Sequence, residues 1–147
     1  MQKFKLNKIS FLLGKNAINV KSYKESFPEW DLEKIVSKTG INTINKVGEG
    51  ETAVDLAVNT LNLFLKEHAF EKTDIDSLIF VTQSPDYSLP TSACIIQDMV
   101  GLRKNILVFD INLGCSGFVN ALSVASSLIS NNVVKNCAIV CAETYSK

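Results

Sequence analysis

The sequence has no long apolar run, no excess of charge of either sign and only one histidine among its 147 residues. No apolar run approaches the roughly 20 residues that a transmembrane helix needs, and the N-terminal run ISFLL is too short for a signal-peptide core. Fifteen basic residues balance fifteen acidic ones, and no basic stripe with interleaved aromatic residues supports nucleic-acid binding. With 46% hydrophobic and 20% charged residues, the composition is that of a soluble globular domain, which we expect in the cytoplasm.

The sequence has few of the residue patterns that commonly bind metal ions, because it contains one histidine and no cysteines paired in a CxxC motif. The one histidine, His68, lies in the helical pattern LFLKEHAF, which favours a solvated helix position over a catalytic role. The four cysteines form no CxxC motif, so we expect free thiols in a reducing cytosol. Cys137 and Cys141 lie about 13 Å apart along a predicted strand, too far to share one metal ion. The sequence therefore predicts no metal site.

The chain does contain an alternation of strand and helix patterns, with no linker, low-complexity tract or internal repeat. Strands are predicted over residues 3–12, 77–83, 106–111 and 136–143, and helices over residues 31–38, 51–70, 91–100 and 115–132. The two middle strands are apolar throughout, which is typical of strands buried on both faces. The pattern therefore predicts the α/β class, with a mainly parallel sheet covered by helices.

Local signals mark several helix ends. Thr52, followed by Asp55 three residues later, predicts a capping box at the start of the second helix. Gly40 and Gly101 are expected to stop the first and third helices. The sequence itself stops soon after its last predicted strand, which nothing covers, so we expect it to be part of a larger protein.

The stretch DINLGCSGFVNAL, residues 110–122, places a cysteine among small residues where a predicted strand ends and a helix begins. This junction lies at the carboxyl edge of a parallel sheet, where open α/β folds form their sites. The N-terminal end of a helix stabilises a thiolate and offers N–H groups to an oxyanion. The small neighbours leave room for a bulky acyl group. From spacing alone, Cys115 is equally compatible with a packing residue and a nucleophile.

This stretch resembles the active-site segment of the type III 3-oxoacyl-acyl-carrier-protein synthases, in the thiolase-like superfamily. IVSKTGI (35–41), SPDYSLPTSACIIQDMVGL (84–102) and AIVCAET (138–144) occur in the order and spacing of that family. The resemblance covers nearly the whole chain but only the N-terminal half of a family member. It implies that residues 1–147 form an N-terminal thiolase-like domain. Its fold would be one βαβαβαββ unit, with a mainly parallel mixed sheet, of a five-layer αβαβα fold.

The resemblance also implies an activity. The thiolate of Cys115 would take an acyl group from acyl-CoA and condense it with malonyl-acyl-carrier-protein, giving a 3-oxoacyl-acyl-carrier-protein in fatty-acid or related biosynthesis. These two thioesters are substrates, and no cofactor is implied. The family's catalytic histidine and asparagine belong to the other half, so this chain alone is expected to be inactive. Family members are homodimers, in which the strand corresponding to residues 106–111 pairs across the two-fold axis.

The same resemblance suggests residues that bind substrate. Lys38 and Lys147 match basic positions near CoA, although Lys38 is equally well explained as a solvated lysine and lacks the bidentate fork of the family's arginine. Lys34 stands where the family has a tryptophan that stacks on adenine. Trp30, one turn earlier, either substitutes for that tryptophan or packs with Phe27.

Three further residues have both a functional and a structural interpretation. Leu89 matches a family residue that lines the partner's acyl pocket, and otherwise anchors a proline-flanked loop. Asn112 is interpreted as a turn residue rather than a catalytic one. Glu143 ends the last predicted strand at the edge that carries Cys115, where a structural hydrogen bond is favoured over a role in lining the site.

Other functions remain open from the sequence. A related acyltransferase would move the acyl group to oxygen or nitrogen, giving an ester or an amide. An enzyme similar to hydroxymethylglutaryl-CoA synthase would carry an additional glutamate. The third alternative is a non-catalytic module that dimerises or binds a carrier protein and keeps an unused cysteine.

Overall fold

The computed structural model describes residues 4–145, which fall into two compact units. The larger unit contains residues 4–12 and 52–145, and the smaller one contains residues 13–51. In the described part of the chain, no helix combines the length and apolar character needed to cross a membrane.

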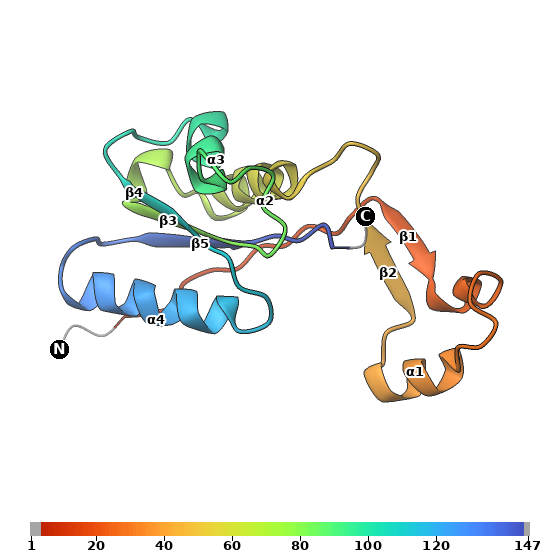
Figure 1. The fold of residues 1–147 in the computed structure, drawn as a ribbon. Helices are drawn as coiled ribbons and strands as arrows, with labels where there is room; N and C mark the ends of the chain where they lie inside the picture. Colours follow the sequence, from red (N-terminus) through yellow and green to blue (C-terminus); the bar gives the residue numbers. More distant parts are fainter. Residues whose placement is uncertain (1–3, 146–147) are drawn as a thin grey trace. The chain divides into compact units, whose positions relative to one another are not determined.

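A parallel three-stranded sheet forms the centre of the larger unit (Figure 1). Strand β3 (Ser77–Val81) lies between β4 (Leu107–Ile111) and β5 (Cys137–Cys141), and each pairing extends over five residues. Every residue of β3 is buried, because this strand has a neighbour on each side and helices on both faces. The predicted α/β class and the three strands around residues 77–83, 106–111 and 136–143 are confirmed.

Helices cover both faces of this sheet (Figure 1). Helices α2 (Ala53–His68) and α3 (Ser92–Val100) cover one face, and α4 (Gly117–Ser130) covers the other; a short 3-10 helix, η2 (Lys72–Asp74), precedes β3. Successive side chains of a strand point to opposite faces, so β3 contributes to two cores. Leu78 and Phe80 join the core beneath α2 and α3, while Ile79 and Val81 join the core with Ala121 and Ala125 of α4.

The predicted helix ends are found in the structure. Thr52 caps α2 by accepting a hydrogen bond from the Asp55 N–H at 3.2 Å, and the Asp55 carboxylate accepts one from the Thr52 N–H at 2.9 Å. Gly101 ends α3 with a positive φ of 74°, a conformation that glycine adopts without a steric penalty.

Two predictions about strands are wrong. Residues 4–14 form no strand. Residues 5–12 line a cavity of about 490 Å³ together with β5. Strand β4 is not buried on both faces, since its residues are exposed or half-buried. The reason is its place at the edge of the three-stranded sheet.

The smaller unit is built around an antiparallel pair, β1 (Asn16–Asn19) and β2 (Thr43–Lys46). Between them lie the 3-10 helix η1 (Val20–Lys24) and α1 (Leu32–Thr39). Asp31, predicted as the first residue of the helix, caps α1 instead. Gly40 ends α1 in the left-handed conformation, as the sequence predicts. The two short strands of this pair were not predicted.

Candidate active site

Cys115 lies in a tight turn between β4 and α4, at the carboxyl edge of the parallel sheet. The Gly117 N–H closes this turn by donating to the Gly114 carbonyl at 2.9 Å. Cys115 is exposed, and α4 begins two residues after it, with Ser116 at the cap position. The side chain of Ser116 makes no capping hydrogen bond. An exposed thiol at this point is open to a substrate, which a packing residue would not be.

The two glycines beside Cys115 are pressed against the end of β3. A Cβ on Gly117 would overlap Cγ1 of Val81, and a Cβ on Gly114 would overlap Oε1 of Gln83. The first overlap involves a buried strand side chain, and the second involves the end of a flexible one. The small residues around Cys115 therefore let the turn approach residues 81–83 closely, a use that the sequence did not suggest.

Glu143 connects the ends of β5 and β3 beside this turn. Its Oε1 accepts a hydrogen bond from the Gln83 N–H at 2.5 Å, and its Oε2 accepts one from the Ser84 hydroxyl at 2.7 Å. The Thr144 N–H donates to the same hydroxyl at 3.2 Å. The structural hydrogen bond expected for Glu143 is therefore present, and sequence reasoning missed its partners Gln83 and Ser84.

Asp110, in the strand before the cysteine, is a residue whose role the sequence reasoning missed. Its two carboxylate oxygens accept hydrogen bonds from the N–H groups of Ser92 and Ala93, at 2.8 and 2.7 Å. It therefore caps α3 from a neighbouring strand. The available signal was a carboxylate inside an otherwise apolar strand, since such a group requires hydrogen-bond donors. Asn112 is confirmed as a turn residue, because the Leu113 N–H donates across it to the Ile111 carbonyl at 3.0 Å.

The other cysteines differ from Cys115 in their surroundings. All four are free thiols, as predicted. Burial raises the pKa of the Cys137 thiol. Partial burial and then the negative charge of Glu143 raise the pKa of Cys141. Both thiols therefore hold their protons to higher pH than an ordinary cysteine. Cys94 is exposed on α3, where it accepts a hydrogen bond from the Thr91 hydroxyl at 3.4 Å.

His68 is half-buried rather than solvated, so that prediction is wrong. Its Nε2 lies 3.1 Å from the Ser10 hydroxyl, and its ring meets the Phe64 ring edge to face with centroids 5.0 Å apart. His68 ends α2, which leads into the start of β3, whereas Cys115 follows the opposite, carboxyl end of the sheet. Among residues 4–145, no three side chains of histidine, cysteine, aspartate or glutamate are grouped to bind a metal ion.

The residues expected to bind substrate lie in several places. Leu89 is 83% exposed, in the loop before α3 of the larger unit. Lys38 is exposed in the last turn of α1, in the smaller unit. Trp30, also in that unit, stacks on Phe27 with ring centroids 4.3 Å apart and remains 42% exposed. Lys147 lies outside the described residues.

Comparisons with known proteins agree on one family. The family model described as "3-Oxoacyl-[acyl-carrier-protein (ACP)] synthase III" matches residues 109–147. The chain is 39% identical over 115 residues to the Beta-ketoacyl-[acyl-carrier-protein] synthase III of Sulfurovum sp. (strain NBC37-1), covering 78% of this chain and 34% of that protein. It is 37% identical over 146 residues to the synthase III of Campylobacter curvus (strain 525.92), covering 92% of this chain and 43% of that protein.

The fold agrees with the sequence match. A crystal structure of a 3-oxoacyl-(acyl-carrier-protein) synthase III superposes with a TM-score of 0.85 at 36% identity, covering 91% of this chain and 40% of that one. The chain thus spans less than half the length of the relatives it matches. On the combined evidence of sequence and fold, the chain belongs to the thiolase-like family of the 3-oxoacyl-acyl-carrier-protein synthases III and corresponds to the N-terminal portion of its members.

Proposed function

We propose that the complete protein containing this chain is a decarboxylating condensing enzyme with Cys115 as its nucleophile. The observation that carries this proposal is the exposed thiol of Cys115, in a glycine-flanked turn at the carboxyl edge of the sheet. Membership of the synthase III family supplies the reaction class. The substrates would be an acyl-CoA and malonyl-acyl-carrier-protein, and the product would enter fatty-acid or related acyl-chain biosynthesis in the cytoplasm.

The reaction proceeds in two stages. The Cys115 thiolate attacks the carbonyl carbon of acyl-CoA, the carbon–sulfur bond to CoA breaks, and CoA leaves as its thiolate. Malonyl-acyl-carrier-protein then loses carbon dioxide, and the resulting carbanion attacks the acyl-enzyme. The new carbon–carbon bond forms as the Cys115 thiolate is released. Covalent catalysis suits this order because the enzyme holds the acyl group while the second substrate enters.

The chain offers part of the machinery for these steps. The Cys115 N–H, in the turn before α4, is our proposed donor to the oxyanion of each tetrahedral intermediate; loss of one such donor typically costs about 10²–10³ in rate. Lys38, Trp30 and Lys147 are proposed to contact CoA. Leu89 is proposed to reach the acyl pocket of a second subunit in a homodimer paired through β4. The proton donors for decarboxylation would come from the remainder of the protein.

Intact-mass measurement of the full-length protein after incubation with short acyl-CoAs tests the proposal. We expect a mass increase of one acyl group, lost in Cys115→Ala and retained in Cys94→Ala, the matched control at another exposed thiol. An adduct that persists in Cys115→Ala would assign the nucleophile elsewhere. Absence of any adduct across acyl chains of different length would favour a non-catalytic module.

A further inference from the structure

We propose that Glu143 is a positioning residue for Cys115 and acts through Gln83. This inference rests on the proposed function of Cys115 as a nucleophile. It adds a role for the carboxylate that joins the ends of β5 and β3. Two contacts link Glu143 to Cys115: one from Glu143 to the backbone N–H of Gln83, and one from the side chain of Gln83 to the turn that contains Cys115.

The first contact extends the sheet beyond its last paired residues. The β3–β5 ladder ends with Val81 opposite Cys141. Past that pair, the Glu143 carboxylate accepts from both the Gln83 N–H and the Ser84 hydroxyl, at 2.5 and 2.7 Å. Hydrogen bonds to a charged acceptor are stronger than those between neutral groups. Glu143 therefore holds the Gln83 N–H and the Ser84 hydroxyl, in addition to the hydrogen bonds that Ser84 makes with Thr82 and Thr144.

The second contact is between the side chain of Gln83 and the turn that contains Cys115. The Gln83 carboxamide occupies the space beside Gly114, where a Cβ would overlap its Oε1. On the other side of Cys115, Gly117 packs as closely on Val81. Residues 81–83 thus contact both glycines of the turn. Val81 is held within the buried strand, so Gln83 is the movable contact, and Glu143 holds it in place.

A carboxylate at position 143 can accept both of these hydrogen bonds, whereas an amide cannot. Both of its oxygens accept hydrogen bonds, whereas a glutamine offers one acceptor oxygen and turns an NH₂ group toward a donor. Glu143→Gln therefore loses the charge and one of the two contacts with little change in volume. The same substitution removes the negative charge that contributes to the raised pKa of Cys141. Faster alkylation of Cys141 then confirms that the charge has been removed.

The test measures acylation of Cys115 in the full-length protein under single-turnover conditions with a short acyl-CoA. In Glu143→Gln we expect the acylation rate at saturating acyl-CoA to fall about tenfold, because small misplacements of reacting atoms are costly. The half-saturating concentration of acyl-CoA should stay unchanged. Gln83→Ala should have a similar effect, and the double variant should be no slower than the slower single variant, since both act through one contact.

Asp76→Asn is the matched control. Asp76 also joins β3 to β5, but at the opposite, amino end of these strands. Its loss lowers stability without touching the turn. If Asp76→Asn slows acylation as much as Glu143→Gln, or if Glu143→Gln acylates at the wild-type rate, the positioning role is wrong. If the wild-type protein itself takes no acyl group, the proposed function fails instead.

Discussion

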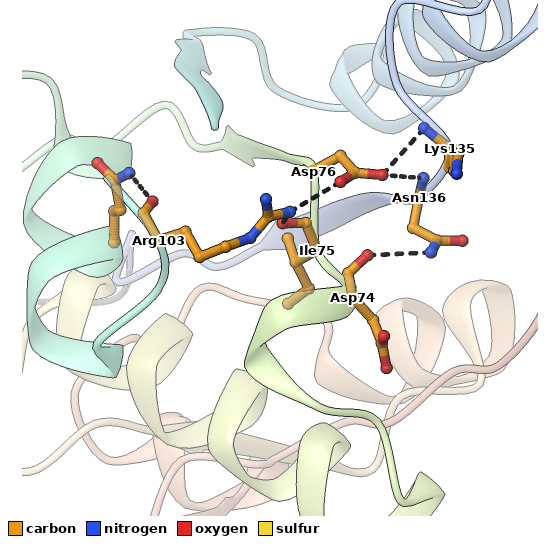
Figure 2. Close-up of polar contacts among 7 residues, drawn as sticks. Asp74, Ile75, Asp76, Arg103, Lys135 and Asn136 are labelled. Atoms are coloured by element: carbon orange, nitrogen blue, oxygen red, sulfur yellow. Dashed lines mark hydrogen bonds and ion pairs between the residues drawn. The ribbon is translucent and has the colours of Figure 1, made fainter. Parts of the chain in front are cut away.

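Asp76 joins the starts of all three strands of the larger unit. Figure 2 shows its contacts with Arg103, Lys135 and Asn136. Its Oδ2 accepts hydrogen bonds from the N–H groups of Lys135 and Asn136, just before β5, at 3.0 and 3.1 Å. Its Oδ1 accepts from Nη2 of Arg103 at 2.8 Å, and its backbone carbonyl accepts from the Leu107 N–H of β4. Burial opposes ionisation of this carboxyl, but the hydrogen bonds outweigh it and lower the pKa of Asp76 below its ordinary value.

Replacing Asp76 by asparagine should therefore destabilise the protein in a pH-dependent way. A carboxyl with a lowered pKa in the folded state stabilises the fold above its unfolded pKa and loses that contribution as the pH falls through the folded value. We expect Asp76→Asn to lower the free energy of unfolding at pH 7 by about 1–3 kcal/mol. The difference from wild type should shrink below about pH 4. Urea unfolding curves at pH 7 and pH 3 measure both effects.

Asp98 provides the control for that experiment. It forms an ion pair with Lys104, and both side chains are largely exposed. The hydrogen bond and the charge of Lys104 lower the pKa of Asp98. Exposed pairs contribute little to stability because solvent screens them. Asp98→Asn should leave the unfolding curve at pH 7 unchanged, and equal losses in the two variants would contradict the special role of Asp76.

At the scale of elements, helix α3 is capped from outside its own sequence. The residue at its cap position, Thr91, makes no capping hydrogen bond, and the first N–H groups are bound instead by Asp110 of β4. A negative charge at the N-terminus of a helix also interacts favourably with the helix dipole. The cap therefore fixes the helix and the strand that leads to Cys115 against each other.

This arrangement predicts a larger loss of stability from substituting Asp110 than from substituting Thr91. Asp110→Asn keeps one acceptor oxygen for two N–H groups, so we expect it to lower the free energy of unfolding by about 1–2 kcal/mol. Thr91→Ala should cost less, because its side chain donates only a weak bond to the Cys94 sulfur. Chemical denaturation of both variants measures the difference. A larger loss for Thr91→Ala would show that the local residue is the effective cap.

Sequence reasoning succeeded where the signal is local. The capping box of Thr52 and Asp55 and the glycines that end α1 and α3 depend on a few neighbouring residues, and all are found. It failed where the role of a residue depends on a hydrogen-bond partner distant in the sequence. Asp110 caps a helix that begins 18 residues earlier, and Glu143 binds residues 59 and 60 positions away. The position of Cys115 could be predicted, but the residues that support its turn could not.

The same distinction explains the errors in the strands. Residues 4–12 carry a strand pattern, but a strand needs a backbone partner, and these residues form none. The apolar sequence of β4 predicts burial on both faces, whereas the described chain leaves one edge of that strand unpaired. The pattern of apolar residues indicates which residues favour burial. It does not indicate whether another strand or helix of this chain packs against them.

At the scale of the whole molecule, the chain holds the proposed nucleophile, Cys115, but its one histidine lies elsewhere. Its two buried cores lie on the two faces of the three-stranded sheet. Its one histidine lies at the helix end that leads into the start of β3, while Cys115 follows the carboxyl end of the sheet. Such an arrangement cannot place the His68 imidazole beside Cys115. The chain also spans less than half the length of the relatives it matches.

The 147-residue chain alone should therefore give no 3-oxoacyl product from acyl-CoA and malonyl-acyl-carrier-protein, while the longer protein should. Without the proposed proton donors for decarboxylation, the carbanion does not form, although alkylation of the exposed Cys115 thiol does not depend on them. Product is measured by mass spectrometry, and alkylation of Cys115 with iodoacetamide in the same sample checks that the thiol is intact and accessible.

His68→Gln in the longer protein should leave turnover unchanged, because His68 contacts Ser10 and Phe64 away from the site. Product from the 147-residue chain, or loss of turnover in His68→Gln with the fold retained, would mean that this chain supplies its own proton donor.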